Sequence, residues 1–223
     1  MTKYICEYGN EEYKVGCTGG TIIILEKNTG KVIDKIKLPY ISMGVLVPFQ
    51  RIFIAKSTDG ILLKYDIETK EIIKKRTSKL TQDGGMGLCP WDGHLYNVEM
   101  TEQGFRITVY DVNTMQIITN VPIRGDIVDV SDLEFGLESS VWYVALSYFY
   151  KGRVKNSIAK MENYNCVSYR EIDFDLFNHA IGYKYLERCG FTEDALEIAK
   201  MFSDKCQTPI SLAELYKNAN QRQ

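Results

Sequence analysis

Hydrophobic and polar residues alternate along most of the chain in short runs. These runs are separated by residues typical of turns. Runs at 22–25, 61–65 and 107–110 have the period of two that is typical of a β-strand with one buried face. Each run is followed by an acidic residue, by a threonine three positions later, and by a second run rich in β-branched residues. The pattern therefore predicts three β-hairpins of one kind.

The turn of each predicted hairpin has nearly the same sequence. The three copies begin at Glu26, Asp66 and Asp111, and their threonines lie 40 and 45 residues apart. An acidic side chain at this position can accept backbone N–H groups across a tight turn, and a threonine hydroxyl can do the same. Gly30 provides a positive φ in the first copy. A spacing of about 40–50 residues is that of a propeller blade.

Further apolar runs extend this repeat to four units of four short strands. One strand is predicted before each hairpin, at 13–17, 51–55 and 94–100. The second and third units have one more strand before these, at 44–47 and 86–89. A more divergent fourth unit is predicted from runs at 127–130, 141–148, 157–161 and 167–172. Its turn contains Asn163, a residue type that tolerates the left-handed conformation. Residues 1–174 are therefore predicted to form a mainly β domain.

The turn sequence also resembles that of a known class of proteins. Residues 28–32, Asn-Thr-Gly-Lys-Val, are similar to the D-x-x-T-G-K-V turn of β-propeller repeats, in particular the quinoprotein-like and YVTN-like blades. The resemblance to WD40 blades is more general, because Trp91-Asp92 precedes a strand instead of ending a blade. The resemblance implies a four-bladed or partial propeller of four-stranded antiparallel blades. The motif specifies a turn, so no quinone or other cofactor is expected.

Four units are few for a propeller, which usually has four to eight blades. Three arrangements are compatible with the sequence: a ring closed within one chain, an open arc whose edges the C-terminal segment covers, and an arc completed by a second copy. An uncovered edge strand would present unpaired backbone groups. We therefore favour closure within one chain.

After residue 174 the apolar period becomes helical. Phe177, Ile181 and Tyr185 recur every four residues, and the segment 175–223 is predicted to be a helical tail of three short helices. One interpretation is a structural cap on the propeller. The other is an element for partner binding or self-association, with Tyr185, Leu196 and Phe202 on its apolar side.

Charge and cysteine content narrow the possible functions. The formal net charge is −2, from 27 basic and 29 acidic residues, which favours neither nucleic acid nor a membrane as partner. Lys74-Lys75-Arg76 is the densest basic run, and we interpret it as a solvated strand edge. The six cysteines include no C-x-x-C pair, and the N-terminus lacks a signal-peptide pattern, so a cytoplasmic protein with reduced thiols and no metal is expected.

One loop contains residue types that could bind a small molecule. Residues 82–94 include Asp83, Trp91, Asp92 and His94. Together they could line a ligand pocket, and a less favoured alternative is a metal site formed by His94 with Asp83 or Asp92. The stronger interpretation is structural: Asp92-Gly93 is a hairpin turn, Trp91 packs between blades, and His94 starts a strand. No catalytic residue is assigned.

A second candidate region is aromatic. Tyr148, Phe149 and Tyr150 end a predicted strand and run into a Lys-Gly turn, so they could form an exposed binding surface. The sequence therefore favours a non-enzymatic protein-interaction scaffold on a propeller, with the tail for assembly or partner docking. The alternative is a small-molecule-binding or hydrolytic propeller that uses Asp83, Asp92 and His94.

Overall fold

The computed structural model describes residues 6–9, 12–18, 20–47, 50–77, 85–102, 104–123, 126–135 and 140–172. Sheet 1 contains β1 (Cys6–Gly9), β2 (Tyr13–Cys17), β3 (Thr21–Glu26) and β4 (Val32–Lys37). Sheet 2 contains β5 (Ile41–Leu46), β6 (Ile52–Ser57), β7 (Ile61–Asp66) and β8 (Ile72–Arg76). Sheet 3 contains β9 (Met86–Leu88), β10 (Leu95–Thr101), β11 (Gly104–Tyr110) and β12 (Ile117–Val121). Sheet 4 contains β13 (Ile127–Phe135), β14 (Val141–Tyr150), β15 (Arg153–Glu162) and β16 (Asn165–Ile172).

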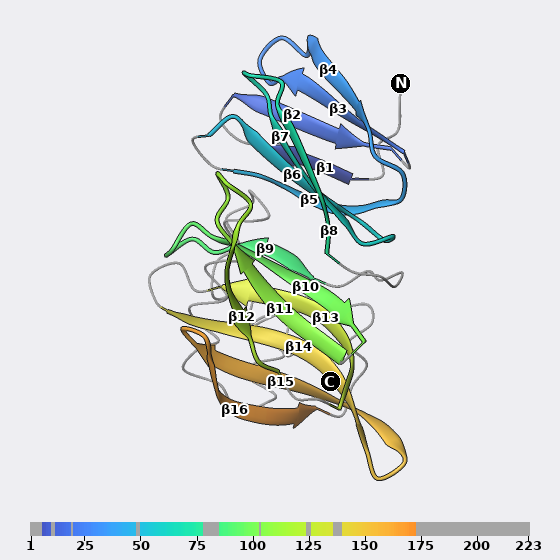
Figure 1. Ribbon diagram of the computed structural model, residues 1–223, viewed down its shortest axis with the longest axis vertical. Helices are drawn as coiled ribbons and strands as arrows, with labels where there is room; N and C mark the ends of the chain where they lie inside the picture. Colours follow the sequence, from blue (N-terminus) through green and yellow to red (C-terminus); the bar gives the residue numbers. More distant parts are fainter. Residues whose placement is uncertain are drawn as a thin grey trace, which may run out of the picture. The chain divides into compact units, whose positions relative to one another are not determined.

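Each sheet is an antiparallel meander in which strands that are consecutive in sequence are neighbours (Figure 1). The described part of the chain is thus mainly β, and the prediction of four four-stranded antiparallel sheets is confirmed. Strand β1 was not predicted, because no apolar run marks residues 6–9. The predicted helical tail, 175–223, lies outside the described residues, and closure within one chain stays a prediction.

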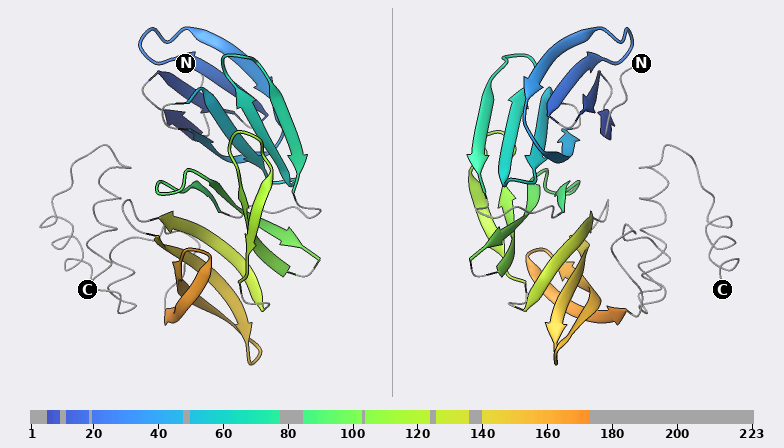
Figure 2. Two further views of the ribbon diagram at one scale, coloured as in Figure 1. Left: turned by 60° about the vertical axis from the view of Figure 1, so that its left-hand side comes forward. Right: turned by 90° about the vertical axis from the view of Figure 1, so that its right-hand side faces the viewer.

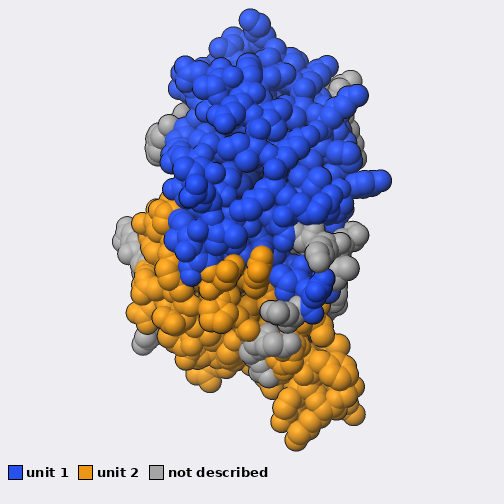
Figure 3. Space-filling model, viewed as in Figure 1, with its two compact units in different colours: residues 1–88, 95–103, 108–119 blue, residues 89–94, 104–107, 120–223 orange. Residues whose placement is uncertain are grey.

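The chain forms two compact units (Figure 3). The first contains Met1–Leu88, Leu95–Gln103 and Thr108–Thr119, and the second contains Cys89–His94, Gly104–Ile107 and Asn120–Gln223. Sheets 1 and 2 belong to the first unit and sheet 4 belongs to the second. The described residues include no helix that is long and apolar enough to cross a membrane.

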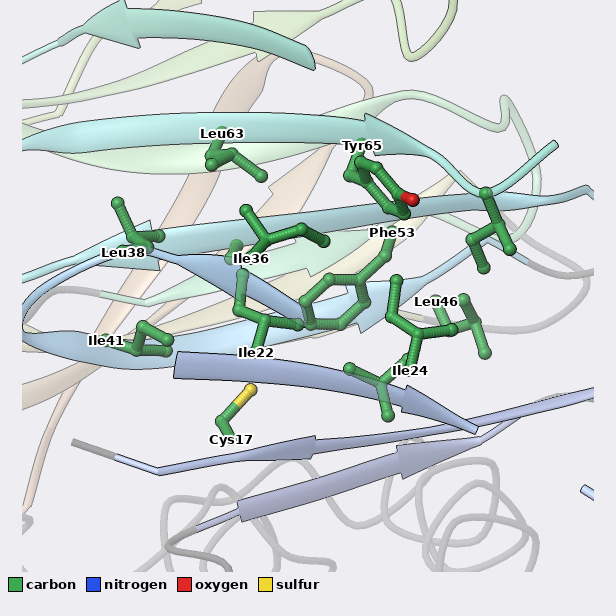
Figure 4. Packing of buried hydrophobic residues seen from close by; sticks show 13 residues of the cluster. Cys17, Ile22, Ile24, Ile36, Leu38, Ile41, Leu46, Phe53, Leu63 and Tyr65 are labelled. Carbon is green, nitrogen blue, oxygen red and sulfur yellow. The ribbon is translucent and has the colours of Figure 1, made fainter. Parts of the chain in front are cut away.

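In the first unit, sheet 2 is buried on both faces because alternate residues of β6 enter two different clusters. Phe53 and Ala55 pack against residues of sheet 1, including Ile22 and Ile24 (Figure 4). All four are fully buried. The Phe53 ring lies so close to β5 that a Cβ at Gly44 would be 2.5 Å from its Cζ atom.

The intervening residues of β6 face the other way. Ile52 and Ile54 join Leu62 of β7 in a second cluster with Leu95 and Tyr110 of sheet 3. Since successive side chains of a strand point to opposite faces, sheet 2 lies between sheet 1 and sheet 3. Face-to-face stacking of consecutive meanders is consistent with a propeller-like fold.

Two lysines of sheet 2 donate to backbone carbonyls of β10 and of the turn between β11 and β12. The Nζ atom of Lys56, which is 3% exposed, donates to the carbonyl of Val98 at 2.6 Å. Lys75 donates to the carbonyl of Met115 at 3.3 Å, and its Nζ lies 4.7 Å from the centroid of the Tyr110 ring. The basic run at 74–76 is therefore not simply a solvated edge, because Lys75 is used in packing between sheets.

The repeated turn has the hydrogen bonds expected from its sequence in two of its three copies. Oδ1 of Asp66 accepts the N–H groups of Glu68 and Thr69, each at 2.9 Å. Oδ1 of Asp111 accepts those of Asn113 and Thr114 in the same way, at 3.0 and 2.7 Å. In the first copy the longer Glu26 side chain accepts the Thr29 hydroxyl instead.

The position after the threonine is left-handed in all three copies. Its φ is 68° at Gly30, 64° at Lys70 and 57° at Met115. Only the first copy has glycine there. In the other two copies the hydrogen bonds of the turn hold Lys70 and Met115 in a backbone conformation that L-residues rarely adopt. Asn163 in the fourth unit has a φ of 49°, which confirms the prediction for that turn.

Acid should weaken the second turn. The bond from the Thr69 N–H is the main cause that lowers the pKa of Asp66 below its usual range. A depressed carboxyl pKa contributes stability above the unfolded value of about 3.9, and this contribution is lost as pH falls through the folded pKa. Asp66→Ala should cost about 1 kcal/mol of unfolding free energy at neutral pH. The difference from wild type should shrink below about pH 4 in urea denaturation series; a difference independent of pH would contradict this account.

Candidate interaction surface on the β14–β15 hairpin

Strands β14 and β15 form the longest hairpin of sheet 4. Each has 10 residues, whereas β13 has 9 and β16 has 8. The last pair of β13 with β14 is Ile127 with Tyr148, and the pairing of β15 with β16 ends at Asn156. The hairpin therefore extends past both neighbouring strands, as Figures 1 and 2 show. We call residues 149–155 the hairpin tip.

A tight turn closes the hairpin tip. Tyr150 pairs with Arg153, and only Lys151 and Gly152 connect them. Their φ angles are 49° and 77°. Two consecutive positive φ values define the type I′ turn, whose twist matches that of the strands it joins. The turn therefore holds the tip as a regular two-stranded ribbon.

The two faces of the tip differ in chemistry. Phe149 pairs with Val154, so their side chains share one face, and they are 53% and 59% exposed. Tyr150, which is 43% exposed, lies on the other face with its partner Arg153. Lys155 belongs to this second face, because it is two residues from Arg153 on the same strand. One face is apolar and the other is aromatic and basic.

The carboxylate of Glu171 binds two side chains of the basic face where the hairpin joins the sheet. Glu171 of β16 accepts the Tyr148 hydroxyl through Oε1 at 2.6 Å. Its Oε2 atom is 2.6 Å from Nζ of Lys155. Tyr148 itself is only 3% exposed, so it supports the tip, while Phe149 and Tyr150 present the surface. Of the three aromatic residues predicted from the sequence, two are therefore accessible to a partner.

Sequence reasoning missed the residues that β15 adds to this surface. Arg153, Val154 and Lys155 face Tyr150, Phe149 and Tyr148 across the hairpin. Their contribution depends on the pairing register, which the Lys151-Gly152 turn fixes. A two-residue turn between alternating runs was the signal that could have identified them.

The other predicted site lies in the loop between β9 and β10, and Asp92 and His94 form its turn. The Cys89 N–H donates to the His94 carbonyl at 2.9 Å, and the His94 N–H donates to Oδ1 of Asp92 at 2.9 Å. Oδ2 of Asp92 lies 3.3 Å from Nδ1 of His94. Gly93 has a φ of 70°. Burial raises the pKa of the Cys89 thiol to about 12, which favours the protonated thiol near neutral pH.

The remaining candidates of this loop are only partly accounted for. Trp91 is half-buried, and its Nε1 atom is buried. Asp83 lies outside the described residues, as do Tyr185, Leu196 and Phe202 of the predicted tail. The described ranges contain no group of three His, Cys, Asp or Glu side chains able to hold a metal ion. A ligand site formed by Asp83, Trp91, Asp92 and His94 stays a prediction.

Comparison with known proteins identifies a fold and no family. No protein-family model and no curated protein matches the chain. Among solved structures, it is similar to a chain in the crystal structure of a mitotic checkpoint complex, with a TM-score of 0.53 and 12% sequence identity. The match covers 78% of this chain and 54% of the other, so this chain spans about half the length of that protein. At this identity the likeness shows the fold alone, a mainly β arrangement consistent with a propeller.

Proposed function

We propose that this protein is a non-enzymatic protein-interaction scaffold, built on propeller-like sheets, which docks a partner through the hairpin tip. The observation that carries the proposal is the pair of exposed apolar side chains, Phe149 and Val154, on a ribbon that extends beyond its sheet. Exposed aromatic residues with adjacent arginine are typical anchors of protein interfaces.

The base of the hairpin gives these anchors a rigid support. Trp142 of β14 is fully buried, and Val144, Ala145 and Leu146 are as well. A rigid anchor loses little conformational entropy on binding, which favours affinity. The structural neighbour is part of a multi-protein complex, which supports a scaffold role by analogy of fold. The tail, 175–223, is proposed as a second element for assembly.

Removing the apolar anchors should weaken partner association strongly. In affinity capture from cell extract with quantitative mass spectrometry, the full chain with Phe149→Ser and Val154→Ser should recover its specific partner about tenfold less than wild type. Both residues are half exposed or more, so the substitutions should leave the thermal midpoint nearly unchanged.

The matched control replaces two exposed apolar residues of other sheets. Val32 and Ile72 are 46% and 45% exposed and each lies at the start of the last strand of its sheet. Val32→Ser with Ile72→Ser should capture the same proteins as wild type. The scaffold proposal would be refuted if every protein captured by wild type were captured equally by the tip variant.

A further inference from the structure

The charge of the hairpin tip differs from that of the chain. Residues 149–155 contain Lys151, Arg153 and Lys155 and no acidic residue. The whole chain, by contrast, has a formal net charge of −2. A local cluster of cations on a weakly acidic protein attracts an anionic partner to that place and not to the surface in general.

The cations of the tip are arranged around one ring. Nζ of Lys151 lies 5.2 Å from the centroid of the Tyr150 ring, and Nζ of Lys155 lies 5.3 Å from it. Ammonium groups at these distances are attracted by the ring. Arg153 is the cross-strand neighbour of Tyr150. The basic face therefore presents its charges at positions that the fold restricts, with less entropy to lose when a carboxylate binds.

The same face already binds one carboxylate of the chain itself. Glu171 bonds the hydroxyl of Tyr148 and the ammonium group of Lys155. Lys151 and Arg153 lie farther toward the turn, and the structure shows no acidic side chain of the described residues paired with either. A tyrosine and a cation, Tyr148 and Lys155, thus bind Glu171, and a second tyrosine, Tyr150, has cations beside it nearer the turn.

We propose that the hairpin tip binds an acidic segment of a protein partner, with carboxylates at Lys151 and Arg153 and an apolar side chain against Phe149 and Val154. This inference rests on the proposed scaffold function and names the chemistry of the partner. Carboxylates match arginine in a bidentate geometry. The apolar face, with two side chains, is small for stable membrane anchoring, and the three cations of the tip are few for the continuous row of phosphates of a nucleic acid.

Binding of defined probes to the full-length protein tests the proposal. The probes are a short fluorescent peptide of alternating glutamate and leucine, its lysine counterpart, phosphatidylserine vesicles and polyuridine RNA. We expect the acidic peptide to bind most tightly in fluorescence anisotropy, and its affinity to fall with added salt. Lys151→Glu with Arg153→Glu should weaken its binding about tenfold or more. Lys31→Glu with Lys35→Glu changes the net charge equally on exposed residues of the first unit and should leave binding unchanged.

Loss of peptide binding in the tip variant, with normal binding in the control and unchanged circular dichroism in both, supports the proposal. The proposal is overturned if the acidic peptide does not bind, if it binds the tip variant equally, or if RNA or vesicles bind the tip more tightly. Should the peptide fail while Phe149→Ser with Val154→Ser still loses its captured partner, the scaffold function stands and only the acidic partner is refuted.

Discussion

Replacing Glu99 with alanine should lower the free energy of unfolding by about 3–5 kcal/mol. Glu99 of β10 is 1% exposed, and among the described residues three side chains donate hydrogen bonds to its carboxylate. Thr108 donates at 2.8 Å, Asn97 donates at 3.3 Å, and the Tyr110 hydroxyl donates as well. Alanine would leave these buried donors without their acceptor, at a cost of about 1–3 kcal/mol for each one not compensated.

Two further variants separate this cost from a general effect of mutation. Glu99→Gln keeps one acceptor oxygen and the side-chain volume, so it should cost about 1–2 kcal/mol. Glu71→Ala changes an exposed glutamate and should alter stability by no more than about 0.5 kcal/mol. Urea denaturation of the three proteins gives the comparison. Equal stabilities of Glu99→Ala and Glu71→Ala would show that the polar cluster has no role in holding sheet 3.

Replacing Trp142 with alanine should destabilise sheet 4 by about 3–5 kcal/mol. Trp142 is fully buried, and its ring stacks on Phe135 with centroids 5.6 Å apart. Its Nε1–H donates to the carbonyl of Asn163 at 2.6 Å, which connects β14 to the turn between β15 and β16. Alanine would remove both the packing and this bond, and the side chains around it could fill only part of the cavity.

The variant Trp142→Phe separates the contribution of ring packing from that of the hydrogen bond to Asn163. It keeps an aromatic ring against Phe135 and loses the bond to Asn163, so its cost should be about 1–3 kcal/mol. Thermal unfolding followed by circular dichroism measures both variants. The hairpin tip begins at the end of β14, the strand that contains Trp142. The alanine variant should therefore also bind the protein partner of the tip more weakly than Trp142→Phe does. If the two variants unfold at the same midpoint, ring packing is not what stabilises this sheet.

Local patterns predicted the strands, with the exception of β1, and the turns at Asp66 and Asp111. The Asp66 and Asp111 carboxylates accept the backbone N–H groups that their spacing to the threonine suggested. These bonds join residues within three positions of each other, so the information lies in one short segment. The missed strand β1 shows the limit of this reasoning, because its pairing with β2 gives it structure that its own sequence does not indicate.

Only part of the candidate surface could be found from the sequence. Phe149 and Tyr150 were predicted because an aromatic run met a Lys-Gly turn, and both are exposed. Tyr148 belongs to the same run but is buried, since it still pairs with Ile127 of β13. Whether a residue of this run is exposed depends on where the neighbouring strands end, and that is a property of the sheet.

The sequence alone determined the class of this protein: repeated alternating runs and acid-and-threonine turns specify antiparallel meanders, because strand period and turn hydrogen bonds are local. Tertiary structure decided which residues of those strands can act together. It buried Glu99 beside the side-chain donors Asn97, Thr108 and Tyr110 of its own and the adjacent strand, and it placed Arg153 and Lys155 beside Tyr150 on a hairpin that extends past strands β13 and β16. Such groupings depend on register and on sheet packing, which bring together side chains whose separation in the sequence carries no signal of its own.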